Sequence, residues 1–415
     1  VYAQRFKGRT FVFQIDYSII DHPFFPGLVK DLVMLKQLGI DIVLVPGARQ
    51  HIDETLRRYG VEWEMRGGVR VAGPEAIPFI KMAAFDVANN LMTLLTGQEA
   101  SAVIGNWVRA RAIGVRDGVD YGDAGVVEKI KRSLLLQVLE AGNTPIFPCI
   151  GWSAAGTPYN ISSRELATTI SVELRAAKLF FVTEEAIPRR GEFTLPDELE
   201  TDVEGRISRM TLQQTEELLR LNGGVSAEAQ SPEVSGEAGG ETRSRKGEAL
   251  ELLERARHAA QRGVDRVHIV DGRIEGVILK EIFSNLGVGT MVHANIYQSI
   301  RAMTPEDVAD VFRIMQPWVD RGVLVPRSED RLSETYPDYV VYETDGSIHG
   351  CGALHRYSTT LGEIAGLAVD EKYEQLGIGR KIVEYLIESA RGLALKRVVV
   401  LTTQASDWFQ QMGFE

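Results

Sequence analysis

The sequence is poor in cysteine and contains no long uninterrupted hydrophobic run. Its 415 residues include two cysteines, Cys149 and Cys351, which are too few for a disulfide framework and lack the spacing of metal ligands. No apolar stretch reaches the roughly 18 residues that a membrane-spanning helix needs. The start, VYAQRFKGRTFVFQ, has no apolar core behind a basic tip, so we predict no secretory signal. These absences favour a cytoplasmic protein with no bound metal.

Positive charge is also in deficit. The 46 lysines and arginines face 57 aspartates and glutamates, which gives a net charge of −11. We therefore expect no broad binding to nucleic acid or to anionic membranes, although a local basic pocket for an anionic ligand is compatible with this balance. A length of 415 residues with 44% hydrophobic residues predicts two or three domains with cores of their own.

The first part of the chain alternates between strand-like and helix-like segments. The run IDIVLV at Ile40–Val45 is apolar apart from Asp41, as in a strand that is covered on both faces. This alternation predicts a mainly parallel sheet between layers of helices. The predicted strands are Thr10–Ile15, Ile40–Val45, Ala102–Ile104, Pro145–Ile150, Lys178–Val182 and Arg266–Val270. The predicted helices are Gly27–Leu38, Gln50–Tyr59, Lys131–Ala141, Ser162–Ala176, Leu212–Leu221 and Ala249–Gln261.

The segment Asn222–Glu248 interrupts this pattern. It reads NGGVSAEAQSPEVSGEAGGETRSRKGE and contains no aromatic residue, leucine, isoleucine or methionine. Such a segment cannot bury enough apolar surface to offset the entropy lost on ordering. We predict a disordered insertion, 222–248, within the first domain.

A second domain is predicted to begin near Gln298. Thr304-Pro305 is typical of a helix start, with threonine at the N-cap and proline at the first helical position. Strands are then expected at Tyr339–Glu343, His349–His355, Glu363–Val369 and Arg397–Thr403, with a helix at Gly377–Gly392. Before this helix comes the glycine-containing turn QLGIGR. The backbone N–H groups of such a turn and of the first helical turn suit a pyrophosphate, although a lone G-x-G is also common in ordinary turns.

Two stretches of the chain resemble known families. The segment GEIAGLAVDEKYEQLGIGRKIVEYLIESARG resembles motif A of the GCN5-related N-acetyltransferases, with Glu374 at the first position of the glycine pattern. The first half resembles the amino-acid kinase fold, and the two in this order resemble the N-acetylglutamate synthase family. The pieces that match are VPGARQHIDETL, VRDGVDYG, FSNLGVGTMV and LTTQASDWFQQMGF. The resemblance implies an α/β fold, with an amino-acid kinase-like domain at 1–295 and a GNAT acetyltransferase domain at 299–415 whose last strand is truncated.

The resemblance further implies a reaction between acetyl-CoA and L-glutamate, the first step of arginine biosynthesis. Glu363 would be the catalytic base, and a general acid is not identified. Substrate would be bound by Arg301, Thr402 and Thr403. The implied acetyl-CoA contacts are Gly366, Leu367, Val369, Gln375, Leu376, Gly377, Ile378, Gly379 and Arg380.

The same family binds arginine in its first domain and forms homo-oligomers through it. For arginine the resemblance points to His268, Glu281, Gly287, Gly289 and Thr290, and it leaves open whether arginine inhibits or activates. Kinases of this fold hold ATP with a lysine and paired glycines, where this chain has Gln14 and Asp16, so we predict an inactive kinase domain. An acetylglutamate kinase-type enzyme and a non-catalytic arginine sensor stay open as alternatives.

Overall fold

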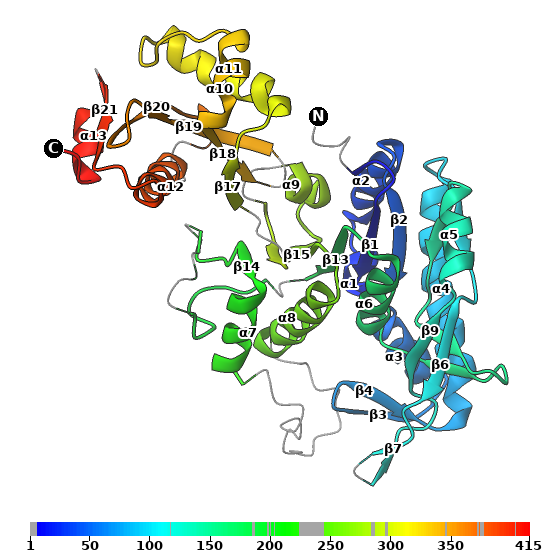
Figure 1. Cartoon of the computed structure of the whole chain (residues 1–415). Coiled ribbons are helices and arrows are strands. Elements are labelled where there is room, and N and C mark those ends of the chain that lie inside the picture. Colours follow the sequence, from blue (N-terminus) through cyan, green and yellow to red (C-terminus); the bar gives the residue numbers. More distant parts are fainter. Residues whose placement is uncertain are drawn as a thin grey trace. The chain divides into compact units, whose positions relative to one another are not determined.

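The chain forms two compact units, Val1–Asn295 and Ile296–Glu415. The structure is a computed structural model, and Figure 1 traces both units. It describes residues 6–116, 118–184, 187–196, 199, 201–202, 204–223, 245–283, 287–294, 298–344, 347–371, 373, 377–402 and 404–415.

The first unit is built on an eight-stranded sheet, in which the described strands are parallel except for the antiparallel pair β15–β16. In the order in which they lie side by side, the strands are β14 (Arg209–Thr211), β16 (Thr290–His293), β15 (Arg266–Asp271), β13 (Lys178–Thr183), β1 (Thr10–Ile15), β2 (Asp41–Pro46), β10 (Thr144–Ile146) and β5 (Ala102–Ile104). The predicted strand positions in this sheet are confirmed within one residue, apart from Pro145–Ile150.

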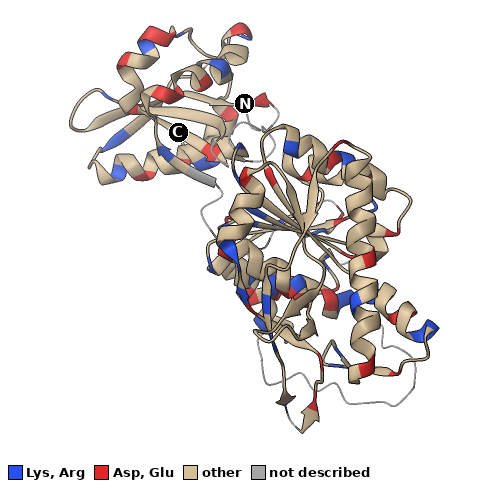
Figure 2. Cartoon of the chain, turned by 90° about the vertical axis from the view of Figure 1, so that its right-hand side faces the viewer, with Lys and Arg blue, Asp and Glu red and all other residues tan. Residues whose placement is uncertain are grey.

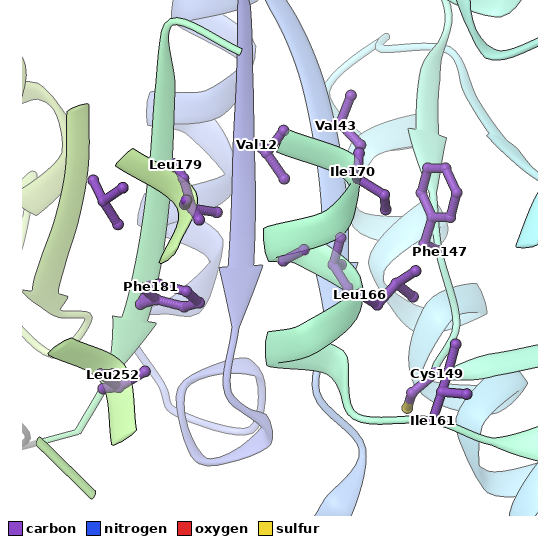
Figure 3. Packing of buried hydrophobic residues seen from close by; sticks show 14 of the residues in the cluster. Val12, Val43, Phe147, Cys149, Ile161, Leu166, Ile170, Leu179, Phe181 and Leu252 are labelled. Carbon is purple, nitrogen blue, oxygen red and sulfur yellow. The ribbon is translucent and has the colours of Figure 1, made fainter. Parts of the chain in front are cut away.

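Helices cover both faces of this sheet. They are α1 (Tyr17–Ile20), α2 (Phe25–Gln37), α3 (Arg49–Arg58), α4 (Ile77–Thr96), α5 (Arg132–Glu140), α6 (Ser163–Leu174), α7 (Leu212–Leu221), α8 (Arg245–Gln261) and α9 (Val277–Phe283), with a 3₁₀ turn η2 (Pro74–Ala76). Successive strand residues point to opposite faces, so Val12 packs with α6 and α8 while Phe11 and Phe13 pack with α2 and α9. Figure 3 shows Leu166 and Ile170 of α6 lying over Val12 and Val43 of the sheet.

A second, mixed sheet and two hairpins flank this core. The second sheet contains β12 (Pro158–Asn160), β11 (Ile150–Trp152), β6 (Val108–Ala112) and β9 (Gly125–Ile130), and two hairpins are formed by β3 (Trp63–Arg66) with β4 (Val69–Ala72) and by β7 (Val115–Arg116) with β8 (Val119–Asp120). The single strand predicted at Pro145–Ile150 was wrong, because its two ends belong to β10 and β11 in different sheets. Between them the N–H of Ile150 turns back to the carbonyl of Pro148.

The ends of the segment predicted to be disordered are ordered. Helix α8 begins at Arg245, four residues before the predicted start, and Glu248 in its first turn forms an ion pair with Arg164 of α6. At the other end, the side-chain amide of Asn222 exchanges two hydrogen bonds with the backbone of Thr194. Residues 224–244 lie outside the described residues.

The second unit contains a five-stranded sheet and is coloured from yellow to red in Figure 1. Its strands, in spatial order, are β17 (Gln298–Ala302), β18 (Tyr339–Thr344), β19 (Ser347–Arg356), β20 (Leu361–Val369) and β21 (Arg397–Val400). Its helices are η3 (Pro305–Asp307), α10 (Val308–Asp320), α11 (Glu329–Thr335), η4 (Tyr336–Asp338), α12 (Ile378–Gly392) and α13 (Ser406–Gln411). Neighbouring strands are antiparallel except β20 and β21, which run parallel.

Two hydrophobic clusters hold this unit together. Val311 and Ile314 of α10 pack on one face of the sheet, and Ile382 and Leu386 of α12 pack on the other. The predicted start at Thr304 is confirmed as a reciprocal cap with Asp307. Figure 2 shows acidic and basic residues on the helices of both units, in keeping with the many short-range ion pairs along them.

Candidate functional site

The sheet of the second unit opens between β20 and β21. The four residues of β21 pair with Leu361–Ile364, which is less than half of the nine-residue strand β20. Among the described residues, the remaining part of β20, Ala365–Val369, has no strand beside it on that edge. Its backbone N–H and C=O groups can therefore bind an extended ligand as a further strand would.

Gly366 lies at the start of this free edge and has a positive φ of 59°. It coincides with a register shift between β19 and β20, so the strand bulges where its neighbour ends. A side chain at Gly366 would be 3.0 Å from the hydroxyl of Tyr339. The predicted contact residues Gly366, Leu367 and Val369 thus lie together on the free edge, although the carbonyl of Val369 already accepts a hydrogen bond of 2.8 Å from Trp318.

Helix α12 begins immediately beyond this edge. Gly377 is its N-cap with a φ of 67°, and no side chain caps the first turn. The first turn contains no acidic residue, so the N–H groups of Ile378, Gly379 and Arg380 present partial positive charge that a phosphate can accept. No described atom lies within 4 Å of a Cβ built on Gly377, so only the backbone conformation requires glycine there.

The remaining predicted cofactor contacts are less informative. Gln375 and Leu376, like Glu374, lie outside the described residues. Arg380 is exposed and forms an ion pair of 2.9 Å with Glu384 one turn further along α12. Its assignment to the cofactor stays a prediction.

Glu363, the predicted base, is buried in β20 at the paired end of the opening. It lies opposite His355 of β19 and opposite Val399 of β21. Sequence reasoning missed Tyr357, whose phenol O–H donates a hydrogen bond to Oε2 of Glu363. This hydrogen bond raises the pKa of Tyr357, as does the negative charge of Glu363. The spacing could have suggested the pair, because Tyr357 and Glu363 are diagonal neighbours across a hairpin.

Arg301, a predicted substrate ligand, is engaged within the protein. Its guanidinium forms a two-pronged ion pair with Asp307, at 2.6 and 3.0 Å, and a further one of 2.5 Å with Glu343. These contacts fasten β17 to the start of α10, and they raise the pKa of Arg301. A substrate carboxylate would share this guanidinium with two protein carboxylates, and the predicted role stays a prediction.

The predicted strand at Arg397–Thr403 ends early, at Val400. Thr402 therefore lies in the turn that follows β21, is exposed, and accepts a 2.9 Å hydrogen bond from the N–H of Ala405 at the start of α13. This local bond explains the early end, because it turns the backbone away from β20. Thr403 lies outside the described residues.

In the first unit, the five predicted arginine-binding residues come together at the end of the sheet. His268 of β15 and Glu281 of α9 are both buried and are joined by a 2.7 Å contact between Nδ1 and Oε1. The other carboxylate oxygen accepts hydrogen bonds from the N–H groups of Val288, at 2.7 Å, and Gly289, at 2.9 Å. Glu281 therefore has three donors of its own among the described residues.

The turn at Gly287–Thr290 needs glycine in two places. Gly287 has a φ of 66°, and a Cβ there would lie 2.6 Å from Oε2 of Glu281. A Cβ on Gly289 would lie 2.3 Å from the carbonyl of Ile269. Thr290 anchors the end of the turn by donating to the carbonyl of Ile207 at 2.5 Å.

Lys178 completes this cluster, and sequence reasoning missed it. The buried Nζ of Lys178 donates to Nε2 of His268 at 3.3 Å, so the imidazole carries its hydrogen on Nδ1 and donates to Glu281. Burial, and then the charge of Lys178, lower the pKa of His268 to about 4. Burial alone would raise the pKa of Glu281, but the hydrogen bonds from His268 and from the turn lower it. At neutral pH a neutral imidazole thus links a buried cation to a buried anion.

The position that holds ATP phosphates in kinases of this fold is filled by side chains. Buried Gln14 donates a 2.9 Å hydrogen bond to Asp16. The other oxygen of Asp16 pairs with Arg164 at 2.7 Å, and Arg164 also pairs with Glu248 and Glu251. Three carboxylates thus surround one buried guanidinium, which is unfavourable for a polyphosphate.

The described residues contain neither a membrane-spanning helix nor a cluster of metal ligands. None of the helices in the described part of the chain is long and apolar enough to cross a membrane. Within the same residues, His, Cys, Asp and Glu form no group of three that could hold a metal ion.

Comparisons with known proteins match both units. The amino acid kinase family model matches residues 18–271, and the acetyltransferase (GNAT) family model matches residues 297–414. The amino-acid acetyltransferase of Aeromonas salmonicida is 32% identical over the whole chain and 90% of its own length. That of Neisseria meningitidis serogroup B is 30% identical over the whole chain and 89% of its length.

Solved structures agree with these matches and confirm the predicted fold class. N-acetylglutamate synthase from Neisseria gonorrhoeae, complexed with coenzyme A and L-arginine, is 27% identical, with a TM-score of 0.82 over the whole chain and 91% of that protein. Its complex with coenzyme A and N-acetyl-glutamate is 28% identical, with a TM-score of 0.60 over the whole chain and 90% of that protein.

Proposed function

The chain belongs to the amino-acid acetyltransferases, with an amino acid kinase unit followed by a GNAT unit, and from this membership we propose that it transfers the acetyl group of acetyl-CoA to the α-amine of L-glutamate. The observation that carries the proposal is the free edge of β20, which lies between Glu363 and the uncapped start of α12. The similar gonococcal enzyme, complexed with coenzyme A and N-acetyl-glutamate, supports the choice of substrates.

In the proposed reaction, the pantetheine arm lies along Ala365–Val369 and the pyrophosphate lies at the first turn of α12. Glu363 takes one proton from the ammonium group of glutamate, because a buried carboxylate with spare acceptor capacity can act as a general base. The amine then attacks the thioester carbonyl carbon, and the carbon–sulfur bond breaks as the carbon–nitrogen bond forms. The second proton of the amine neutralises the CoA thiolate.

The test is an assay of CoA thiol release with L-glutamate, L-glutamine and L-aspartate as acceptors. We expect release with glutamate and a much lower kcat/KM for the other two, because each alters the length or the charge of the side-chain carboxylate. An equal rate with glutamine would contradict glutamate specificity. Absence of release with every amino acid would contradict acetyl transfer altogether.

We also propose that L-arginine is an effector that binds at the cluster of His268, Glu281 and the turn Gly287–Thr290. The gonococcal enzyme complexed with L-arginine supports this choice. A guanidinium binds a carboxylate through two parallel hydrogen bonds, but Oε2 of Glu281 already has two donors. Binding to both oxygens would therefore displace Val288 or Gly289 and move the turn that leads into β16.

Calorimetry can test the effector with a matched ligand. L-citrulline has the shape of arginine without its charge, so we expect arginine to bind and citrulline to bind at least 10-fold more weakly. Arginine should also accelerate amide hydrogen exchange at Val288 or Gly289. If arginine and citrulline bind equally, or if acetyl transfer is unchanged at saturating arginine, the effector role is wrong.

The kinase-type alternative predicts ADP formation from ATP and N-acetylglutamate. We propose that this activity is absent, because phosphoryl transfer depends on positioned positive charge and Arg164 is already held by Asp16, Glu248 and Glu251. ADP formation that depends on N-acetylglutamate would support the kinase-type alternative.

We further propose that copies of the chain associate through the first unit. Exposed apolar side chains on and beside α2, namely Phe24, Met34 and Leu38, support this choice of unit. Light scattering should give a mass well above the 46.0 kDa of one chain. A monomer at micromolar concentration would contradict the proposal.

A further inference from the structure

The carboxylate of Glu363 is held by a tyrosine from the hairpin next to it. Tyr357 follows β19 directly, and its phenol O–H donates to Oε2 of Glu363. The ring is 63% exposed, whereas Glu363 is 8% exposed, so the tyrosine lies over the carboxylate from the solvent side. Among the described residues, it is the side chain that hydrogen-bonds to this carboxylate.

The loop that carries Tyr357 is rigidly built. The N–H groups of Tyr357 and Ser358 both donate to the carbonyl of Leu361, at 3.0 and 3.2 Å. The hydroxyl of Ser358 accepts from the N–H groups of Thr360 and Leu361 at 3.1 Å each, and the carbonyl of Thr360 accepts from the start of β21. The backbone position of Tyr357 is therefore fixed relative to both strands that flank the opening.

The strand register explains why the phenol reaches the carboxylate. His355 pairs directly with Glu363, and Tyr357 lies two residues beyond His355, on the same face of the hairpin. Diagonal neighbours of this kind are within reach of an aromatic side chain. His355 has no hydrogen bond to the carboxylate among the described residues, and its Nδ1 contacts Asp338 at 2.8 Å.

No lysine or arginine forms an ion pair with Glu363 among the described residues, although Arg356 and Arg397 lie opposite Gly362 and Leu361 of β20. Arg313 of α10 pairs with Asp370 at 3.7 Å, Arg321 pairs with Glu371, and Arg380 of α12 pairs with Glu384. The hydrogen bond from Tyr357 is thus the specific polar contact that sets the orientation of Glu363 in the described part of the chain.

We infer that Tyr357 is a positioning residue for the base: its phenol holds Oε2 of Glu363, so that Oε1 is left to accept the proton of the acceptor amine. The inference rests on the proposed role of Glu363 and adds a residue that acts through it. The hydroxyl itself does not exchange a proton with substrate. Because its pKa is raised, the phenol stays protonated over the pH range in which Glu363 works.

The test compares Tyr357→Phe with Tyr385→Phe in the intact chain. Both tyrosines are exposed, at 63% and 40%, and Tyr385 lies in the second half of α12, where its hydroxyl has no role in the proposed site. For Tyr357→Phe we expect kcat/KM for glutamate to fall about 10-fold, the usual effect of one hydrogen bond to a charged group. The loss should be in kcat, while the KM for acetyl-CoA stays the same. Tyr385→Phe should match the wild type throughout.

A double variant separates this inference from the proposed function. If Tyr357 acts through Glu363, the change Tyr357→Phe should cost nothing further in a chain that already carries Glu363→Gln. Should Glu363→Gln retain full activity, the proposed base is wrong. Should Glu363→Gln be inactive while Tyr357→Phe keeps the wild-type kcat, the base stands and the positioning role of Tyr357 is overturned.

Discussion

Glu281 in the first unit and Glu363 in the second are equally buried, each 8% exposed, but they differ in the hydrogen bonds that they receive. Glu281 accepts from His268, Val288 and Gly289, whereas Glu363 accepts from Tyr357 among the described residues. A carboxylate that accepts hydrogen bonds from three protein donors holds structure together, and a ligand that uses both of its oxygens must displace one of those donors. One with acceptor sites left over can take a proton from a ligand. Burial alone therefore does not distinguish a structural from a catalytic carboxylate, but the number of donors does.

We expect the largest effect for a substitution of Glu281, the glutamate with three hydrogen-bond donors. Glu281→Ala would remove the acceptor of buried His268 and of two backbone N–H groups. We expect the free energy of unfolding to fall by about 3–5 kcal/mol, because three donors lose their partner at once. Urea denaturation measures this, and Glu254→Ala, which breaks a half-exposed pair with Arg257 on α8, should cost only about 0.5 kcal/mol. Equal costs would show that Glu281 is not a structural carboxylate.

The second test uses pH instead of substitution. The pKa of His268 is lowered from 6.5 to about 4, so the unfolded chain binds a proton there more readily than the folded one. Its contribution to stability is complete above pH 6.5 and is lost as the pH falls towards 4, by up to about 3 kcal/mol. His268→Asn should flatten this slope in denaturation measured across that range. His258→Asn changes an exposed histidine of α8 and should leave most of the slope of stability against pH. An unchanged slope in His268→Asn would contradict the assignment of that slope to His268.

For Glu363, which has acceptor sites left over, we expect an effect on the reaction rate. Glu363→Gln should lower turnover about 10²-fold or more, the usual scale for loss of a general base, while the unfolding midpoint changes little. The amide can still accept from Tyr357, so the packing is kept. Steady-state kinetics and thermal unfolding of the same sample decide the point. If Glu363→Gln loses stability but keeps its turnover, Glu363 is a structural carboxylate and not a catalytic one.

The first turn of α12 has backbone N–H groups without a side-chain cap, so the same question of free hydrogen-bonding groups applies to them. Gly377→Asp would place a carboxylate beside N–H groups that the protein leaves uncapped, and would strain a residue with a φ of 67°. We expect acetyl-CoA to bind at least about 10-fold more weakly and the affinity for glutamate to change little. Fluorescence or calorimetric titration measures both. Unchanged acetyl-CoA affinity would remove this turn from the cofactor site.

We expect the smallest effect for Tyr339, and this test asks whether a buried polar group without a hydrogen-bond partner has a function. The hydroxyl of Tyr339 is buried against Gly366 and has no hydrogen-bond partner among the described residues. Because nothing is lost with it, Tyr339→Phe should leave the free energy of unfolding unchanged or raise it by up to about 1 kcal/mol, with activity retained. A destabilised variant would reveal a partner for the hydroxyl.

Local sequence patterns were enough to predict most of the strands and helices. Runs such as IVLV in β2 and LFFV in β13 are apolar because the sheet is covered on both faces, and the glycine at 377 marked a turn with a positive φ. These signals are local, since strand period, caps and glycine conformation depend on neighbouring residues. The resemblance to known families supplied the order of the units and the candidate residues, which no local pattern contains.

The tertiary structure alone decided which groups are free to act. His268 and Glu281 look like any strand histidine and helix glutamate in the sequence, and Lys178 is 90 residues from the histidine that it contacts. Arg301 could have faced a substrate, but the fold turns it to Asp307 and Glu343. Hydrogen-bond saturation depends on distant residues that meet only in the folded chain. For that reason the sequence could propose Glu281 and Glu363 as functional carboxylates, and only the folded chain could tell them apart.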